Sequence, residues 1–599
     1  MDTLKYRDIR KKYIDFFKKN NHEEIPSAPL VPENDPSVLF VNAGMFPLVP
    51  FLMGEQHPKG KRLTNSQRCV RTGDIEEVGN NFHCTAFEML GNWSLNDYFK
   101  KEAINLTVEF FVKELGLNIQ NIYASVFGGE DDIPEDKESI SVWKELFKTY
   151  DIDAKVGPGE RIQKFGKKEN WWGLESGGPC GPDSEIFYDT GKNACDGNCN
   201  LNCDCGKYVE IGNNVFMQYF KEGDSLKPLG IHNVDFGGGL ERITALIQNV
   251  DNLYEIDIYK PILEKVQEIS RDGDIKSQRI IVDHIKAATW IIMDGVIPSS
   301  NQQGYILRRL IRRAVRHAKK LGIEKPFTRE IATVAIDQFS EIYPDLGKKR
   351  EKILDVIEQE EEKFNNTLEN GLKELESLLE KKIAIDGESA FKLYETYGLP
   401  LEVTEEILLE KGVTLKERDS FFQAQKKHQE KSRTASKGLF KGGLADTSEM
   451  SLKYHTATHL LLTALRKVLG NHIYQMGSNI TSERLRLDFP NESKLTPEQV
   501  KEVEDIVSMA IEKELDISYE EKSKEEALEI IEQESSSASF VEKYGDTVKV
   551  YYVGPKDNPF STEICNGPHV GNTRELTKLK IVKQENVGAG VKRIKAILQ

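Results

Sequence analysis

Two pairs of metal-binding side chains constrain the fold of this chain more than any other feature. The stretch HTATH spaces His455 and His459 four positions apart, and CNGPH, 106 positions after His459, spaces Cys565 and His569 in the same way. On a helix, residues four apart share a face, so the two histidines can hold one ion. A glycine and a proline inside CNGPH place the second pair on a loop. We expect the fold to bring helix and loop together around one zinc ion.

A plainer interpretation of HTATHLLLTAL is an amphipathic helix with two histidines on its polar side, and it would account for either pair alone. Both pairs in one segment favour the metal site. A zinc protease is excluded, because HTATH lacks the glutamate that serves as general base in HExxH.

The composition places the chain among globular proteins. Its 599 residues suggest three to five domains, with 30% charged and 39% hydrophobic residues. We find no run of about 18 apolar residues that could span a membrane. The N-terminal stretch MDTLKYRDIRKKYIDFF resembles neither a signal nor a transit peptide, so we expect a cytoplasmic protein. Eight cysteines fit reduced thiols or metal ligands better than a disulfide framework.

One stretch, NQQGYILRRLIRRAVRHAKKLG, is basic although the net charge of the chain is −16. Its apolar residues recur at helical spacing, so we expect the cations on the remaining, exposed surface. These cations are Arg308, Arg309, Arg312, Arg313, Arg316, Lys319 and Lys320. A charged helical face is usually only solvated, but a run of cations without an acid favours contact with the phosphates of structured nucleic acid.

The composition and periodicity of the sequence change along the chain. Residues 1–245 combine short apolar runs with glycine-rich turns, which indicates a mixed sheet-and-helix domain. Residues 246–430 have long helical periodicity. We expect a linker at 431–450, which is rich in glycine, serine and lysine, and a third domain at 451–599 with both helix and strand patterns.

A separate cluster, CDGNCNLNCDC, contains Cys195, Cys199, Cys203 and Cys205. Four thiolates at this spacing could enclose a second, tetrahedral zinc ion. The alternative is a surface loop with reduced thiols.

Five stretches follow one another in the first domain: RCVRTG, HCTAFEMLGNWSLNDYFKKEAI, GPCGPDSEIFYD, NNVFMQYF and VDFGGGLERI. This series strongly resembles the catalytic domain of the alanyl-tRNA synthetases, and the resemblance covers nearly the whole chain. It implies a multidomain α+β protein with an antiparallel-sheet catalytic domain of class II, an α-helical tRNA-recognition domain and an α+β zinc-binding editing domain. It also implies ATP with Mg²⁺, L-alanine and tRNA(Ala) as substrates and partners.

The resemblance assigns roles in alanine activation, a reaction that needs cations around the triphosphate of ATP. Arg71, Asp235 and Arg242 are implied to be catalytic. The implied ATP-binding residues are Arg71, His83, Phe87, Gly237, Gly239 and Arg242, and the alanine pocket is formed by Trp172, Val215 and Asp235.

The small size of alanine makes a second site necessary, one that removes wrongly attached amino acids from tRNA. A pocket for one methyl group also admits glycine and excludes serine weakly, by about 1 to 3 kcal/mol. The HTATH and CNGPH pairs resemble the zinc ligands of the family's editing domain, which hydrolyses mischarged Ser-tRNA(Ala) and Gly-tRNA(Ala).

For tRNA recognition, Asn301 and Glu402 match the positions that face the G3·U70 pair of the acceptor stem, with Arg308, Arg309, Arg312 and Arg313 as further tRNA-binding residues. Glu402 stands where an aspartate is usual.

The chain departs from the family pattern elsewhere too. CNGPH replaces CGGTH, and Asp183 stands in place of a cysteine. The usual β-barrel before the editing helix and the C-terminal domain have no counterpart, so we expect a minimal form that acts as a monomer.

Overall fold

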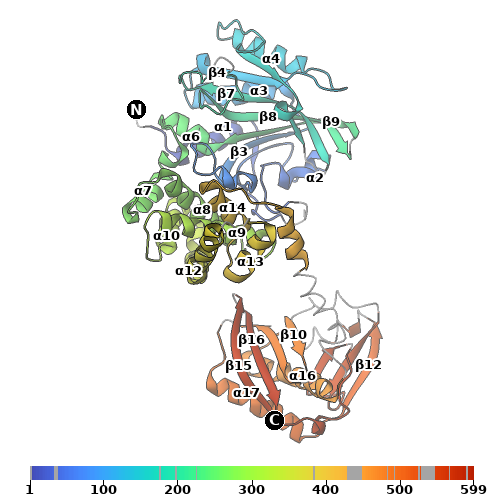
Figure 1. The fold of residues 1–599 in the computed structure, drawn as a ribbon. Helices are drawn as coiled ribbons and strands as arrows, with labels where there is room; N and C mark the ends of the chain where they lie inside the picture. The colour runs from blue at the N-terminus through green and yellow to red at the C-terminus, as the bar shows by residue number, and fades with distance from the viewer. Residues whose placement is uncertain are drawn as a thin grey trace. The chain divides into compact units, whose positions relative to one another are not determined.

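The computed structural model describes residues 3–32, 38–173, 177–195, 199–223, 225–381, 385–427, 448–481, 483–491, 493–523, 526, 527, 530, 547–565, 567–588 and 591–599. They form two compact units (Figure 1): unit 1 comprises Met1–Ile383 and Lys392–Thr414, and unit 2 comprises Ala384–Phe391 and Leu415–Gln599. Most of the expected linker at 431–450 lies outside the described residues, which resume at residue 448. The multidomain α+β architecture is confirmed, whereas the domain boundaries near 245 and 430 stay predictions.

A nine-stranded sheet forms the centre of unit 1, in the order β1-β2-β3-β9-β8-β7-β4-β5, with β6 paired to β7. Its strands are β1 Glu23–Glu24, β2 Arg62–Val70, β3 Ala86–Leu95, β4 Ile122–Phe127, β5 Ile162–Phe165, β6 Trp171–Gly173, β7 Gly178–Asp189, β8 Tyr208–Glu222 and β9 Ser225–Gly239. The pairs β1–β2 and β4–β5 are parallel, and the others are antiparallel. The central strands therefore follow the antiparallel pattern expected of this class.

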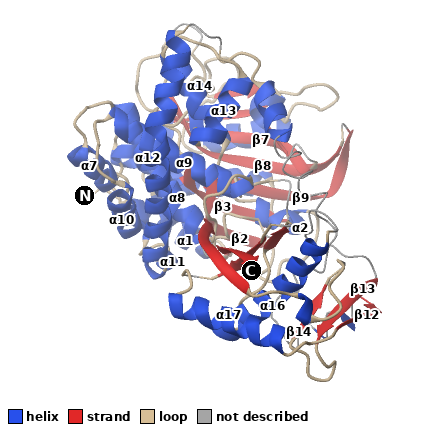
Figure 2. Ribbon diagram, turned by 60° about the horizontal axis from the view of Figure 1, so that its bottom comes forward, coloured by secondary structure: helices blue, strands red, loops and turns tan. Residues whose placement is uncertain are grey.

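Helices surround this sheet and continue beside it as a helical group, which Figures 1 and 2 show from two sides. They are α1 Tyr6–Lys19, α2 Val49–Leu52, α3 Lys100–Glu109, α4 Lys137–Lys148, α5 Lys167–Asn170, α6 Leu240–Gln248, α7 Lys260–Ile269, α8 Ile275–Met293, α9 Gln302–Lys320, α10 Thr328–Phe339, α11 Pro344–Lys348, α12 Arg350–Glu380, α13 Gly387–Tyr397 and α14 Leu401–Glu410. Helix α8 is buried almost all round, as a helix at the centre of a helical group must be, and it packs on α9, α10 and α12.

The described part of unit 2 includes the helices α16 Glu449–Leu469 and α17 Pro497–Glu512, a helical stretch at 419–427, and two antiparallel sheets. One sheet has the order β10-β11-β16-β15 and the other β12-β13-β14. Their strands are β10 Gly477–Ile480, β11 Leu485–Pro490, β12 Ile517–Ser523, β13 Thr547–Val553, β14 Ser561–Ile564, β15 Leu579–Gly588 and β16 Val591–Leu598. A single apolar core joins α16, through residues such as Leu461, and α17 to the inward side chains of the first sheet, including Leu487 and Ile594.

Of the helices in the described part of the chain, none has both the length and the apolar character that crossing a membrane requires.

Candidate functional site

The residues expected to bind amino acid and nucleotide lie on one face of the unit 1 sheet. Paired residues of antiparallel strands share a face, and every second residue of a strand points the same way. Trp93 of β3 pairs with Asp235 of β9, which pairs with Val215 of β8. Two positions along β9, Gly237 pairs with Gly91 of β3. The strand register thus gathers on one surface residues that are far apart in the sequence.

Glycines keep this face open. A Cβ on Gly237 would lie 2.9 Å from Sδ of Met89, and a Cβ on Gly91 would collide with the ring of Trp93. Gly239 pairs with Met89 and lines the adjacent pocket. Because these positions carry no side chain, a ligand can approach the backbone of the strands closely.

Two arginines line the pocket at this end of the face. The guanidinium of Arg71, directly after β2, lies 5.0 Å from the centre of the Phe87 ring, and its Nε donates to the carbonyl oxygen of Asn42 at 3.2 Å. On the first turn of α6, Nη1 of Arg242 lies 2.8 Å from Oε2 of Glu210. The residues around the pocket include Arg71, Asp74, Phe82, His83, Phe87, Glu210, Gly237, Gly239 and Arg242. Two arginines and the rings of Phe82 and Phe87 are a suitable lining for a purine nucleotide with several phosphates.

Asn80 determines which nitrogen of His83 carries the proton. Its Oδ1 accepts from the backbone N–H groups of Phe82 and His83, at 2.9 and 3.0 Å, which turns its Nδ2 towards the His83 ring. That Nδ2 donates to Nδ1 of His83 at 2.7 Å. Because Nδ1 accepts a hydrogen bond, the proton of the neutral ring lies on Nε2. His83 therefore has an N–H group available to a ligand in the pocket.

Asp235 is a buried carboxylate beside an apolar wall. Its Oδ1 accepts a hydrogen bond of 2.6 Å from Nε1 of Trp93. Burial raises the pKa of Asp235 to about 7, and the bond from Trp93 partly offsets this effect. Val215 and Trp93 belong to one apolar cluster, against which Trp172 packs. A small ligand with one cationic and one apolar group matches this arrangement.

Asp183, which stands in place of the family's cysteine, lies in the same row of the sheet. It pairs with Val215 across β7 and β8, is buried, and accepts a hydrogen bond of 3.0 Å from Nδ2 of Asn170. Burial raises the pKa of Asp183 to about 7. This departure from the family pattern adds a second titrating carboxyl group to the row.

The expectation that the cations of α9 lie on the surface was wrong for four arginines, which are buried. They form ion pairs: Arg309 with Glu76 and Glu402, Arg312 with Glu360, Arg313 with Glu406, and Arg316 with Glu406 and Glu410. A guanidinium removed from water requires such a partner. Helices α12 and α14 supply these acids, except Glu76, which follows β2. Although burial opposes the shift, His317 and Arg313 hold the pKa of Glu406 well below its usual range.

The other cations of α9 are less buried. Arg308 is partly exposed, and Lys319 and Lys320 are exposed and pair with Glu369 and Glu410, each at 2.9 Å. The surface charge of α9 is therefore far smaller than its sequence indicates.

Tyr305 links the two residues expected to recognise the acceptor stem. Asn301 is exposed and directly precedes α9, and its carbonyl oxygen accepts from the N–H of Tyr305 at 3.1 Å. The Tyr305 hydroxyl donates to Oε2 of Glu402, on the first turn of α14, at 2.9 Å. The structure thus brings the start of α9 and the start of α14 together.

In unit 2, the four residues of the HTATH and CNGPH pairs meet. His455 and His459 lie on α16, Cys565 directly follows β14, and the possible ligand atoms of these residues and His569 all lie within 4.8 Å of one another. Nε2 of His455 is 3.2 Å from Sγ of Cys565. Burial lowers the pKa of all three imidazoles, that of His455 to about 4, so the rings are neutral, as metal ligands must be.

Hydrogen bonds to the remaining ring nitrogens orient this group. Nδ1 of His455 lies 2.9 Å from the carbonyl oxygen of Pro568, and Nδ1 of His569 lies 3.2 Å from Oγ1 of Thr456. Metal-binding histidines are typically held through the second nitrogen in this way. Within the described residues, the buried Nε2 of His569 has no hydrogen-bond partner. An orphaned buried nitrogen beside a thiol and two imidazoles fits a zinc ligand.

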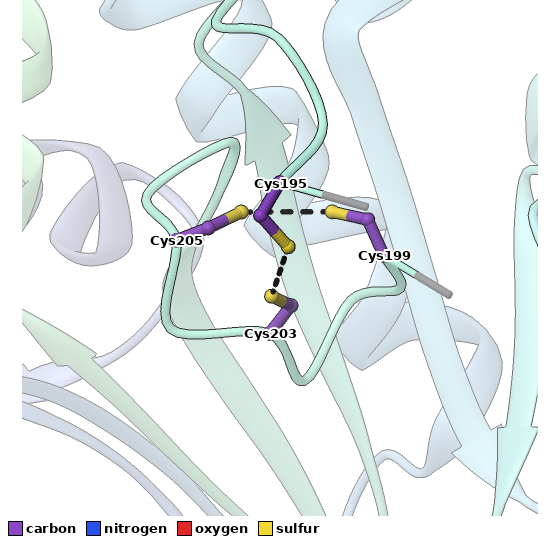
Figure 3. A group of neighbouring side chains, drawn as sticks. All are labelled: Cys195, Cys199, Cys203 and Cys205. Atoms are coloured by element: carbon purple, nitrogen blue, oxygen red, sulfur yellow. Dashed lines mark hydrogen bonds between the residues drawn. The ribbon is translucent and has the colours of Figure 1, made fainter. Parts of the chain in front are cut away.

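A second sulfur group lies in the connection between β7 and β8 (Figure 3). The Sγ atoms of Cys195 and Cys203 are 3.3 Å apart, and those of Cys199 and Cys205 are 3.5 Å apart. All four lie within 4.8 Å of one another. These separations exceed the S–S bond length of about 2.05 Å in a disulfide.

Several residues of these sites were not identified from the sequence. They are Asn80, Trp93, Glu210, Tyr305 and Thr456, and each contacts a residue that was. Asn80 and Thr456 are close in sequence to His83 and to the HTATH histidines, which could have drawn attention to them. Trp93 and Glu210 reach the site through strand pairing and pocket shape, which no local pattern encodes.

Two family models match the chain. Residues 8–481 match the family described as tRNA synthetases class II (A), and residues 548–595 match the threonyl and alanyl tRNA synthetase second additional domain. The first range contains the sheet face, the arginine helix and both histidines of HTATH. The second contains Cys565 and His569.

Three relatives share most of their length with this chain. It is 49% identical over 610 residues to an alanine--tRNA ligase of Treponema denticola, covering 99% of this chain and 98% of that one. It is 46% identical over 604 residues to an alanine--tRNA ligase of Borreliella afzelii, covering 98% and 99%. Identity is 36% over 725 residues to alanine--tRNA ligase 1 of Lachnoclostridium phytofermentans, covering 100% of this chain and 80% of that one.

Proposed function

Because this chain belongs to the alanyl-tRNA synthetase family of class II synthetases, we propose that the sheet face of unit 1 activates alanine with ATP and transfers it to the 3′ end of tRNA(Ala). One observation carries this assignment. The buried carboxylate of Asp235 lies two residues along β9 from the glycine floor of a pocket that contains Arg71 and Arg242.

The reaction has two displacements. The alanine carboxylate attacks the α-phosphorus of ATP, an O–P bond forms, and pyrophosphate leaves with the electron pair of the broken P–O bond. A ribose hydroxyl at the tRNA end then attacks the carbonyl carbon of alanyl-adenylate, and AMP leaves. Both steps depend on positioning and on stabilisation of negative charge more than on acid–base chemistry.

Arg71 stabilises the charge that develops at the α-phosphate. Its contacts with Asn42 and Phe87 fix the guanidinium before substrate binds, so little reorganisation is needed during the reaction. His83 donates its Nε2–H to the γ-phosphate. Adenine stacks on the ring of Phe87, which also contacts the guanidinium of Arg71.

Arg242 and Glu210 have different roles in binding the triphosphate of ATP. Arg242 exchanges its ion pair with Glu210 for the γ-phosphate, and Glu210 is then the carboxylate placed to hold the Mg²⁺ that accompanies ATP. The ion neutralises charge on the phosphate oxygens when bound. Oxygen donors of this kind are the ligands that Mg²⁺ prefers.

Asp235 pairs with the ammonium group of alanine, while Val215 and Trp172 limit the space for the side chain. The hydrogen bond from Trp93 holds one carboxylate oxygen, so the other can face the substrate. A wall of this kind rejects large side chains by overlap. Against serine and glycine it can supply only about 1 to 3 kcal/mol.

We assign the removal of these errors to unit 2, with His455, His459, Cys565 and His569 as ligands of one zinc ion. Bound zinc can act as a Lewis acid or as an anchor for the tRNA end. Pro568 orients the ring of His455 and Thr456 orients the ring of His569, so these two ligands would hold the ion in a constant position. Unit 2 then hydrolyses the ester bond of Ser-tRNA(Ala) and Gly-tRNA(Ala).

For the tRNA itself, we assign recognition of the G3·U70 pair to Asn301 and Glu402. The asparagine amide offers both a donor and an acceptor, and the exposed position of Asn301 leaves it accessible to a minor groove. Arg308, which is partly exposed, contacts the phosphate backbone. Arg309, Arg312 and Arg313 act indirectly, because their ion pairs with α12, α14 and Glu76 fix α9.

A cytoplasmic location and a monomeric state complete the proposal. The location follows from the substrates, ATP and tRNA, and size-exclusion chromatography with light scattering tests the monomer.

The direct test of the function is aminoacylation of a tRNA(Ala) transcript with alanine, serine and glycine. We expect accumulation of Ala-tRNA(Ala) alone. In Cys565→Ala, Ser-tRNA(Ala) should accumulate as well. Charging of a different amino acid, or no charging, would refute the assignment.

A further inference from the structure

In its described residues, the connection between β7 and β8 has little apolar packing. From Thr190 to Lys207 it contains one large apolar side chain, Leu201, which is buried. Loops of this length are uncommon without an internal support, and one leucine cannot supply it. Something other than hydrophobic packing must stabilise this loop.

The base of the loop is closed by hydrogen bonds. Asp189 and Tyr208 are strand partners, the N–H of Thr190 donates to the carbonyl oxygen of Lys207 at 2.8 Å, and Oγ1 of Thr190 donates to the carbonyl oxygen of Gly206 at 2.9 Å. These bonds fix the two ends of the loop. The segment between them contains the four cysteines.

The sulfur atoms converge from four points of this segment. Figure 3 shows all four side chains of Cys195, Cys199, Cys203 and Cys205 directed towards a common centre. Four thiolates around a zinc ion with Zn–S bonds of about 2.3 Å lie about 3.8 Å apart. The distances of 3.3 and 3.5 Å, with an upper limit of 4.8 Å, bracket this value.

We propose that Cys195, Cys199, Cys203 and Cys205 bind a second, structural zinc ion, which fixes one wall of the nucleotide site. All four positions of a tetrahedral ion are then occupied by protein, which is typical of structural sites. The zinc replaces the apolar core that the loop lacks.

The loop contacts the nucleotide pocket through its last residues. Directly after Cys205, Gly206 packs on Phe82: a Cβ at this glycine would lie 3.1 Å from Cζ of that ring. Lys192 pairs with Asp251 in the turn after α6, at 2.9 Å. Thr190, Lys192, Gly206, Phe82, Arg242 and Leu253 line a cavity of about 250 Å³.

This cavity adjoins the pocket that contains Arg71, because Phe82, Arg242 and Leu253 line both. Phe82 also donates its backbone N–H to Asn80, which fixes His83. Loss of zinc should therefore loosen Phe82 and weaken binding of ATP. Alanine binding, which involves Asp235, should be unaffected.

The metal content of the full-length protein, purified without chelators, tests the zinc site. With the unit 2 site also filled, we expect about two zinc ions per chain, and about one in Cys199→Ser, in Cys203→Ser and in Cys565→Ser. Asp204→Asn is the matched control: it removes an exposed carboxylate between two of the cysteines and should keep both ions.

Spectroscopy identifies the ligands. Cobalt bound to Cys565→Ser should show the intense charge-transfer absorption of a tetrahedral tetrathiolate site, and Cys203→Ser should remove it from that background. Titration of thiols with and without a chelator distinguishes metal-bound cysteines from disulfides and from free thiols. Disulfides, or four accessible thiols with no metal, would overturn the proposal.

The effect on ATP rests on the proposed synthetase function, whereas the metal count does not. In alanine-dependent pyrophosphate exchange, Cys199→Ser should have a several-fold higher KM for ATP and an unchanged KM for alanine. If zinc is lost while the KM for ATP stays constant, the link to the nucleotide site is wrong. If the protein shows no exchange at all, the metal count still tests the site.

Discussion

The indole N–H of Trp93 donates a hydrogen bond of 2.6 Å to Oδ1 of Asp235, and the two residues are direct partners across β3 and β9. The ring can lie over the sheet because Gly91, two residues earlier, has no side chain. A core tryptophan thus holds the carboxylate that we assign to the amino group of alanine. The bond connects the packing of the sheet to the recognition of the substrate.

Alanine binding should depend on pH through Asp235. Burial raises the pKa of this carboxyl group to about 7, so it loses its charge as the pH falls through 7, and a neutral carboxyl cannot pair with an ammonium group. The KM for alanine should rise below pH 7 by about tenfold per pH unit and be constant above about pH 8. Pyrophosphate exchange at varied alanine concentration measures this profile.

Two comparisons make that profile specific. The KM for ATP is the internal control and should change little over the same range. Asp183→Asn removes the second buried carboxyl group with a pKa of about 7 and should keep the alanine profile. If the profile disappears in Asp183→Asn, or if wild-type KM for alanine is independent of pH, Asp235 has been given the wrong role.

Asn80 should act on ATP only through His83. Asn80→Ala removes the hydrogen bond to Nδ1 and allows the ring to change its tautomer, so we expect a several-fold higher KM for ATP. Residues that share one contact are not additive. The double variant with His83→Ala should therefore be no worse than His83→Ala alone, and fully additive effects in the exchange assay would contradict this positioning role.

The sites could be predicted from the sequence to different degrees, and the reason is the range of the interactions. His455 and His459 are one helical turn apart, and the same spacing recurs in CNGPH, so local rules were enough to identify the group that meets in unit 2. The row of Trp93, Asp235 and Val215 depends on register between strands that are distant in sequence. The ordered motifs of the resemblance identified Asp235 and Val215, but no local pattern identified Trp93.

Helix α9 shows the opposite case. Its apolar spacing predicted a helix over this stretch, and α9 extends from Gln302 to Lys320. The same pattern predicted exposed arginines, and this was wrong because Glu360, Glu406 and Glu410 come from other helices. Periodicity identifies the buried stripe, but whether a charged face is covered depends on tertiary partners.

Asn301 should decide which acceptor stems are charged. Replacing G3·U70 by G3·C70 leaves a hydrogen-bonding group without its partner, at a cost of about 1 to 3 kcal/mol, or roughly 5- to 150-fold in kcat/KM for tRNA. Asn301→Ala should reduce charging of the G3·U70 transcript and bring the two transcripts closer together. Equal charging of both by the wild-type protein would show that the pair is not recognised.

Cys565→Ala should separate editing from activation. Loss of one zinc ligand should release the unit 2 ion and slow hydrolysis of Ser-tRNA(Ala), while alanine-dependent pyrophosphate exchange stays unchanged because the sheet face is intact. His472→Ala, an exposed histidine of the same unit, is the control and should keep zinc and hydrolysis. A Cys565→Ala protein with full zinc and full hydrolysis would remove the basis for this site.

The most direct test of the account is alanine-dependent ATP–pyrophosphate exchange by the wild-type protein and by Arg71→Ala and Asp235→Ala. We expect exchange in the wild type and a loss of about 2.7 to 4 kcal/mol of transition-state stabilisation, or roughly 100- to 1,000-fold in rate, in Arg71→Ala. Asp235→Ala should be similarly inactive at ordinary alanine concentrations, with circular dichroism unchanged in both. Arg329→Ala, an arginine on the surface of α10, is the control and should exchange normally. Near wild-type exchange in Arg71→Ala and Asp235→Ala would contradict the placement of the active site on this face of the sheet.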